Sequence, residues 1–112
     1  MTSYKIQIQP RAYRDLDWAY RYLESRYGGN VAVDWYNGFI ESLQELHHTP
    51  YRFSYARENK DVQNEIRQLV YERHKNSYRA IYTVSEDVVH VLCVRHVRQK
   101  AVSSRALGLA NS

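Results

Sequence analysis

The sequence predicts a single α+β domain in which a helix hairpin packs on one face of a four-stranded sheet. The chain has 112 residues, enough for one compact core. Its hydrophobic pattern alternates with a period of two at the N-terminus, becomes helical from Arg11, and returns to a period of two near residue 65. Short polar connections join the last alternating segments, which favours an antiparallel meander.

The N-terminal strand and the first helix are separated by a proline. Residues 4–9 alternate apolar and polar and then meet Pro10, which predicts a short strand. Apolar residues then recur at helical spacing until Gly28 and Gly29 supply a stop; they are Ala12, Leu16, Ala19 and Leu23. We therefore expect the first helix over about 11–27.

A second helix is expected over about 31–47. Asn30 can serve as its N-cap, and its apolar stripe ends near His47, shortly before Pro50. The two helices should form a hairpin. Residues 51–64 show no sustained period and indicate a loop.

Three strands are expected beyond this loop. They cover residues 66–72, 77–84 and 88–96, and they are joined by the short polar stretches RHKN and SED. The order is a strand, two helices and a three-stranded meander, with the helices on one face of the sheet. The sequence leaves open which strand neighbours the first one. One domain should span 1–112, with a flexible tail from about residue 101.

The composition is that of a globular protein. Hydrophobic residues make up 44% of the chain and charged residues 25%, too apolar for intrinsic disorder. The N-terminus lacks the apolar core of a signal peptide, and no apolar run is long enough to cross a bilayer. We therefore expect a cytoplasmic protein with no membrane association.

Positive charge is concentrated in the second half of the chain. The formal net charge is +4; residues 1–50 carry five cations and six carboxylates, whereas residues 51–112 carry eleven and six. No carboxylate side chain follows Asp87. An anion-binding surface, if present, should therefore involve the second half, although solubility charge explains the composition equally well.

The alternation within the strands sorts the candidate residues. Tyr78, Ala80 and Tyr82 should point to one face and Arg79 to the other, which we expect to be free of helices. Arg67 and the cluster RHVR, with Arg95, His96 and Arg98, are expected to converge with Arg79 on this open face. Guanidinium groups held there would bind phosphate, with tyrosines available for stacking on bases.

Each of these residues also has a purely structural interpretation. Arg79 can pair with a carboxylate such as Glu72 or Glu86, and the stretch RHVRQK can be a solvated strand end. Cys93 lies in an apolar run and is expected in the core. No metal-binding or cofactor-binding signature is visible, and we expect neither.

The element order, together with the stretches IRQL, YRAIY and VVHVLCVRHVR, resembles the RelE/ParE superfamily of type II toxins, also described as plasmid stabilisation proteins. The similarity covers nearly the whole chain and includes the ARE segment, Ala56 to Glu58. It implies a toxin that a cognate antitoxin neutralises in a hetero-oligomer. RelE-like members cut messenger RNA on the ribosome, and ParE-like members inhibit DNA gyrase.

The resemblance also implies site residues. For a RelE-like nuclease the catalytic residues would be Arg79, His96 and Arg67. For target binding, Arg95 and Arg98 join the two arginines. The RHxR ending and the lack of an aromatic residue after the last strand favour the ParE-like alternative of a gyrase inhibitor. A RelE-like nuclease and, below it, a non-toxic basic nucleic-acid-binding module remain alternatives.

The antitoxin is expected to cover apolar surface on the first helix. Tyr13, Trp18 and Tyr20 are the residues we assign to this contact. An antitoxin that neutralises a cationic toxin should be acidic and should fold on binding.

Overall fold

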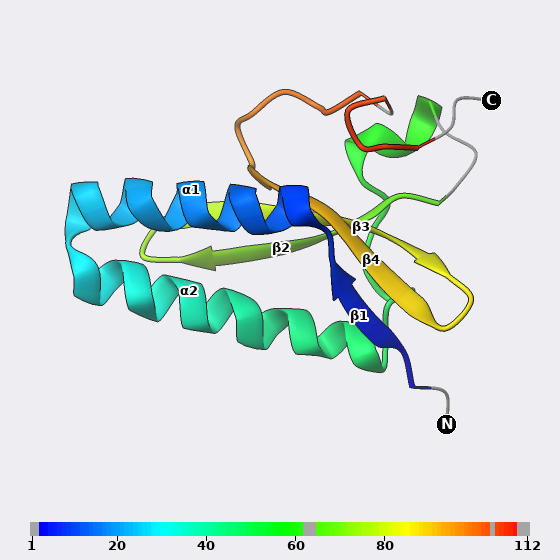
Figure 1. Ribbon diagram of the computed structural model, residues 1–112, viewed down its shortest axis with the longest axis horizontal. Helices are drawn as coiled ribbons and strands as arrows, with labels where there is room; N and C mark the ends of the chain where they lie inside the picture. The colour runs from blue at the N-terminus through cyan, green and yellow to red at the C-terminus, as the bar shows by residue number, and fades with distance from the viewer. Residues whose placement is uncertain (1–2, 62–64, 104, 110–112) are drawn as a thin grey trace.

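A four-stranded mixed sheet with two antiparallel helices on one face forms the body of the computed structural model (Figure 1). The structure describes residues 3–61, 65–103 and 105–109. In chain order its elements are β1 (Lys5–Ile8), α1 (Pro10–Tyr27), α2 (Gly29–Leu43), the 3-10 helices η1 (Gln44–His47) and η2 (Arg57–Asp61), β2 (Arg67–Arg73), β3 (Asn76–Ser85) and β4 (Val88–His96). Neither α1 nor α2 is long and apolar enough to span a membrane, and no other helix of the described residues is.

The strand order is β1-β4-β3-β2. The last three strands form the expected antiparallel meander, and β1 pairs parallel to β4, with Lys5 opposite Val88 and Ile8 opposite Val91. The neighbour that the sequence left open is therefore β4, and the sheet is mixed. Because β1 is short, it covers only the first part of the outer edge of β4.

The helix boundaries follow from proline and glycine. Pro10 occupies the first turn of α1, where its missing N–H costs nothing. Gly28 has a φ of 95° and alone separates the two helices, a conformation that side-chain-bearing residues adopt rarely. The cap of α2 is thus Gly28, and the expectation that Asn30 plays this role was wrong. The α-helical part ends at Leu43, where the expected helix to residue 47 continues as η1.

The main core lies between the helices and the sheet. The apolar stripes of both helices are buried there, with Ala12, Leu16, Ala19 and Leu23 from α1 and Ala32, Trp35, Phe39 and Leu43 from α2. Trp35 is in edge contact with Tyr78 of β3, with ring centroids 4.9 Å apart. Full burial of each large apolar side chain of this kind stabilises the fold by about 1.5–3 kcal/mol.

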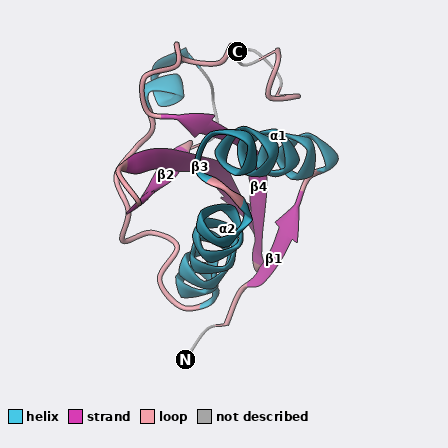
Figure 2. Ribbon diagram, turned by 90° about the vertical axis from the view of Figure 1, so that its left-hand side faces the viewer, coloured by secondary structure: helices cyan, strands magenta, loops and turns pink. Residues whose placement is uncertain are grey.

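A second, smaller core covers the opposite face of the sheet. Ile81 of β3 and Leu92 and Cys93 of β4 belong to this core. They pack with residues from the loop before β2, Ala56 and Ile66, and from the C-terminal segment, Val102 and Leu107. The expectation of an open face was therefore wrong, because η2 and the C-terminal segment lie over it, on the side away from the helices (Figure 2). The mobility of the tail from about residue 101 stays a prediction, and the structure shows where its described residues pack.

A two-residue turn fixes the register of β2 on β3. Arg73 pairs with Asn76, and His74 and Lys75 between them both have positive φ, 54° and 63°. Asp34 of α2 accepts hydrogen bonds from the side chains of Arg73, at 2.5 Å, and of His74, at 2.8 Å. The turn is thereby held against the helix layer.

We expect Gly38→Ala to destabilise the protein. Gly38 lies within α2, and a Cβ atom there would overlap the hydroxyl oxygen of Tyr71 in β2. The overlap should cost about 1–3 kcal/mol, more than the helix propensity that alanine gains. The matched control is Gly29→Ala, where a Cβ meets nothing within 4 Å. Urea unfolding of both variants checks this, and an equal or higher midpoint for Gly38→Ala would contradict it.

Candidate functional site

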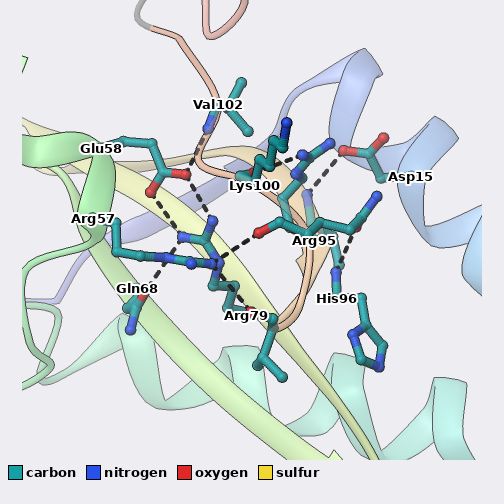
Figure 3. A network of polar contacts seen from close by, with 12 residues as sticks. Asp15, Arg57, Glu58, Gln68, Arg79, Arg95, His96, Lys100 and Val102 are labelled. Atoms are coloured by element: carbon teal, nitrogen blue, oxygen red, sulfur yellow. Dashed lines mark hydrogen bonds and ion pairs between the residues drawn. The ribbon is translucent and has the colours of Figure 1, made fainter.

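Arg79 is buried and is engaged by a carboxylate of the same chain. Its side chain is 2% exposed, and its Nη1 and Nη2 atoms donate to the two oxygens of Glu58, each at 2.7 Å (Figure 3). Gln68 Oε1 accepts a further bond from Nη1 at 3.2 Å. Arg79 does point away from the helices as the alternation predicted, but it does not face solvent. The carboxylate that pairs with Arg79 is Glu58, and it is not Glu72 or Glu86, the two examples named from the sequence.

Glu58 links this arginine to the C-terminal segment. Its side chain is fully buried, and its Oε2 also accepts the backbone N–H of Val102 at 2.8 Å. Burial alone would raise the pKa of the Glu58 carboxyl, but hydrogen bonds from Arg79 and from backbone N–H groups hold the pKa below its ordinary value. The pair is therefore ionised at neutral pH.

Arg67 lies on the other face of the sheet from Arg79. It is directly opposite Tyr82 in the register, and its guanidinium lies over the rings of Tyr51 and Tyr55, 5.5 and 4.4 Å from their centroids. Its Nη1 donates to the carbonyl of Phe53 at 2.6 Å. The expected convergence of Arg67 with Arg79 was therefore wrong.

His96 and Arg95 follow one another on β4 and so point to opposite faces. His96 is opposite Tyr78, with ring centroids 5.1 Å apart, on the face of the helices. Arg95 is opposite Arg79, is half-buried, and donates to the carbonyl of Lys100 at 2.7 Å. The structure thus does not bring His96 together with Arg79 and Arg67, the three residues that the nuclease alternative requires.

A groove runs between α1 and the uncovered edge of β4. β1 ends opposite Val91, so the following residues of β4 have no strand neighbour on that side, and Asp15 of α1 accepts the N–H of Val94 at 2.9 Å. Burial raises the pKa of Asp15, with this hydrogen bond and Arg11 opposing the shift. The groove has a volume of about 530 Å³ and is lined by aromatic residues and cations, including Trp18, Tyr22, Tyr78, Arg95, His96 and Arg98. Arg98 is exposed.

The three residues assigned to antitoxin contact lie on two sides of α1. Tyr13 and Tyr20 border a shallow pocket with Tyr36 of α2, whose ring is in edge contact with Tyr20 at 5.9 Å. Trp18 borders the groove along β4 instead. Tyr13 is 54% exposed and Trp18 is 76% exposed, so both offer apolar surface to a partner.

Sequence reasoning missed Glu58, Asp15 and Val102. Glu58 lies in a stretch with no hydrophobic period. The signal that could have been used is in the tail, where the apolar residues Val102 and Leu107 indicate that the tail packs on the sheet.

Cys93 is buried as expected, and burial raises the pKa of its thiol to about 12. Within the described ranges, no three His, Cys, Asp or Glu side chains are grouped as metal ligands would be.

We expect the Glu58–Arg79 pair to make stability depend on pH. Because the pKa of folded Glu58 lies below its ordinary value of 4.5, the pair stabilises at neutral pH, and this contribution is lost as the pH falls below 4.5 through the folded-state pKa. Glu58→Gln should lower the free energy of unfolding at neutral pH by about 3–5 kcal/mol, since it leaves a buried guanidinium without its countercharge. The difference from the parent should shrink in acid.

Urea unfolding at neutral pH and at about pH 3 measures both effects. The control is Asp17→Asn, which removes an exposed pair with Arg21 and should change stability by less than about 0.5 kcal/mol. A difference between parent and Glu58→Gln that is constant with pH would show that the charge of Glu58 does not stabilise the fold.

Solved structures share this fold. The chromosomal ParDE toxin–antitoxin system from P. aeruginosa includes a chain that superimposes with a TM-score of 0.69 at 20% identity, over 86% of this chain and 98% of that one. A mutant of the E. coli toxin RelE, in the free state, superimposes with a TM-score of 0.55 at 18% identity, over 87% of this chain and 86% of that one. No curated protein matches significantly in sequence.

A family model adds what the folds alone do not show. The model of the ParE toxin of the type II toxin–antitoxin system parDE matches residues 6–101, which include all the helices and strands described above except the first residue of β1. The matched range also contains the Glu58–Arg79 pair and the groove beside β4. The chain therefore belongs to the ParE toxin family of type II toxin–antitoxin systems.

Proposed function

We propose that this toxin acts by binding DNA gyrase, without covalent chemistry, in the cytoplasm. The observation that carries the proposal is the separation of Arg79, Arg67 and His96. A ribonuclease that uses the ribose 2′-hydroxyl needs a base, an acid and cations at one phosphate. Here the guanidinium of Arg79 is buried against Glu58, while Arg67 and His96 lie on the opposite face.

The groove beside β4 is the surface that we assign to the target. Arg98 and His96 border it together with the aromatic rings of Trp18 and Tyr22. An exposed arginine next to aromatic side chains is typical of the residues that contribute most to protein interfaces. Arg79 is a poor probe of this surface, because its replacement leaves the buried carboxylate of Glu58 unpaired.

We expect the chain to arrest growth, to inhibit gyrase supercoiling and to induce the SOS response, without cleavage of messages on ribosomes. His96→Ala should keep gyrase inhibition within a few-fold of the parent, whereas a nuclease that uses this histidine as acid or base would lose about a hundredfold or more in rate. Arg98→Glu should weaken gyrase inhibition about tenfold or more through charge reversal at the contact.

The control for Arg98→Glu is Arg21→Glu, a reversal on the exposed surface of α1. Ribosomal message cleavage by the parent that is lost in His96→Ala would establish the RelE-like alternative. A chain that produces neither effect and does not arrest growth would be a non-toxic binding module.

A cognate antitoxin should bind both sides of α1. The exposed faces of Tyr13 and Trp18 lie on either side of its buried stripe, and Arg95 and Arg98 border the groove on the Trp18 side. An acidic segment that folds on binding fits this combination of apolar and positive surface. The resulting assembly is a toxin–antitoxin hetero-oligomer.

Trp18→Ala should weaken antitoxin binding and leave the stability of the free chain nearly unchanged. A large exposed aromatic residue at an interface centre contributes about 2 kcal/mol or more to binding, and its truncation opens no cavity in the core. Val70→Ala is the matched control, because Val70 is 54% exposed on the far strand β2. Calorimetric titration with the antitoxin encoded beside the toxin gene measures the effect; equal affinities for both variants would exclude Trp18 from the interface.

A further inference from the structure

Several guanidinium groups surround one buried carboxylate on the second face of the sheet. Arg79 and Arg95 are directly opposite one another across β3 and β4, and Arg57 of η2 lies close by (Figure 3). Glu58 is the carboxylate that binds Arg79. The Nε atoms of Arg79 and Arg95 are buried without a hydrogen-bond partner. Burying this excess of positive charge and these unpaired N–H donors under another segment costs free energy.

The C-terminal segment holds this face closed through its backbone. We call its described residues, 97–103 and 105–109, the strap. Arg57 donates to the carbonyls of Val97 and Gln99 at 3.2 and 3.0 Å, and Arg95 donates to that of Lys100. Val102 donates its N–H to Glu58. The side chains that bind the strap, those of Arg57, Glu58 and Arg95, thus belong to the face on which the strap packs.

The apolar part of the strap belongs to the small core alone. Val102 and Leu107 are buried against the face that carries Ile81 and Cys93, and no strap residue belongs to the main core under the helices. Arg11 adds one bond to the carbonyl of Ala106 at 2.6 Å. Release of the strap therefore uncovers the small core but leaves the main core intact, which is the condition for local opening.

Release would also loosen Glu58. η2 is bound to the strap through Arg57 and through Glu58. Outside the strap it is held by the Glu58–Arg79 pair and by the bond from the Ile66 N–H to Asn59. The N–H of Ala56, just before η2, also donates to the Ile66 carbonyl. Once water reaches the ion pair, its attraction is screened, and the pair becomes an ordinary surface contact. Opening of the strap and separation of Glu58 from Arg79 are therefore coupled.

We propose that the strap is a displaceable cover: while it is packed on the sheet, with Glu58 bound to Arg79, it keeps the guanidinium of Arg79 from solvent and from any anionic partner. Its release opens that face while the main core stays folded. The device does not depend on the identity of the toxin's target, because it is defined by the accessibility of the Arg79 guanidinium.

Arginine-selective modification by phenylglyoxal, followed by mass spectrometry of peptides, tests this accessibility directly. In the parent, Arg79 should react far more slowly than the exposed Arg98. In the double variant Val102→Asp, Leu107→Asp, the modification rate of Arg79 should rise by roughly tenfold or more, with that of Arg98 unchanged. Fluorescence of Trp35, which is buried in the main core, should stay native.

A second, milder variant keeps the test informative if the double variant does not fold. Arg57→Ala removes only the two bonds to the carbonyls of Val97 and Gln99 and should raise the rate of Arg79 modification in the same direction, by a smaller factor. Arg79 that stays protected in a folded variant with its strap released would overturn the proposal. So would modification of Arg79 in the parent at the rate of Arg98, or a rise that occurs only with loss of native Trp35 fluorescence.

Discussion

The buried ion pair between Glu58 and Arg79 is the contact on which the second face of the sheet depends. Removing two opposite charges from water costs several kcal/mol per ion, and attraction offsets this cost only when the remaining hydrogen-bonding groups are also satisfied. Glu58 meets the condition by accepting from both terminal nitrogens of Arg79 and from the Val102 N–H. The segment that carries Val102 must therefore cross the sheet at this point, and Leu107 is buried beyond it. The path of the tail follows from charge as much as from apolar pattern.

The groove beside β4 has a separate origin in the short first strand. Pro10 ends strand geometry and starts α1, so β1 pairs with β4 only as far as Val91. An uncovered strand edge is a surface that proteins have to protect. Asp15 occupies one of its N–H groups, and the raised pKa of this carboxyl shows the cost of placing it there. The same proline thus sets the helix boundary and leaves the edge along which aromatic and cationic side chains gather.

Local patterns predicted the elements, and contacts between distant residues decided the site. The alternation around Tyr78, Ala80 and Tyr82 placed Arg79 on the correct face, because side-chain direction in a strand is a local property. The face of Arg67 depends on register. A hairpin that pairs Glu72 with Ser77 also pairs Arg67 with Tyr82, which is three residues beyond Arg79 on β3, so the two arginines must lie on opposite faces. The expected convergence of Arg67 and Arg79 therefore conflicted with the register that the short connection itself implies. No local pattern links Glu58 to a strand residue 21 positions away.

The count of arginines in the second half of the chain therefore differs from the number that can contact a target. Arg57, Arg79 and Arg95 direct donors to Glu58 or to backbone carbonyls, while Arg98 remains exposed at the groove. Bonds to carbonyls do not neutralise charge, so Arg57 and Arg95 still contribute to the long-range field that speeds the approach of an anionic partner. Of the three, Arg79 is the one that a carboxylate, that of Glu58, neutralises. Long-range attraction and direct contact thus fall to different residues. Arg57 and Arg95 contribute to the electrostatic attraction of an anionic partner, whereas Arg98 and the aromatic rings beside it contact the bound partner.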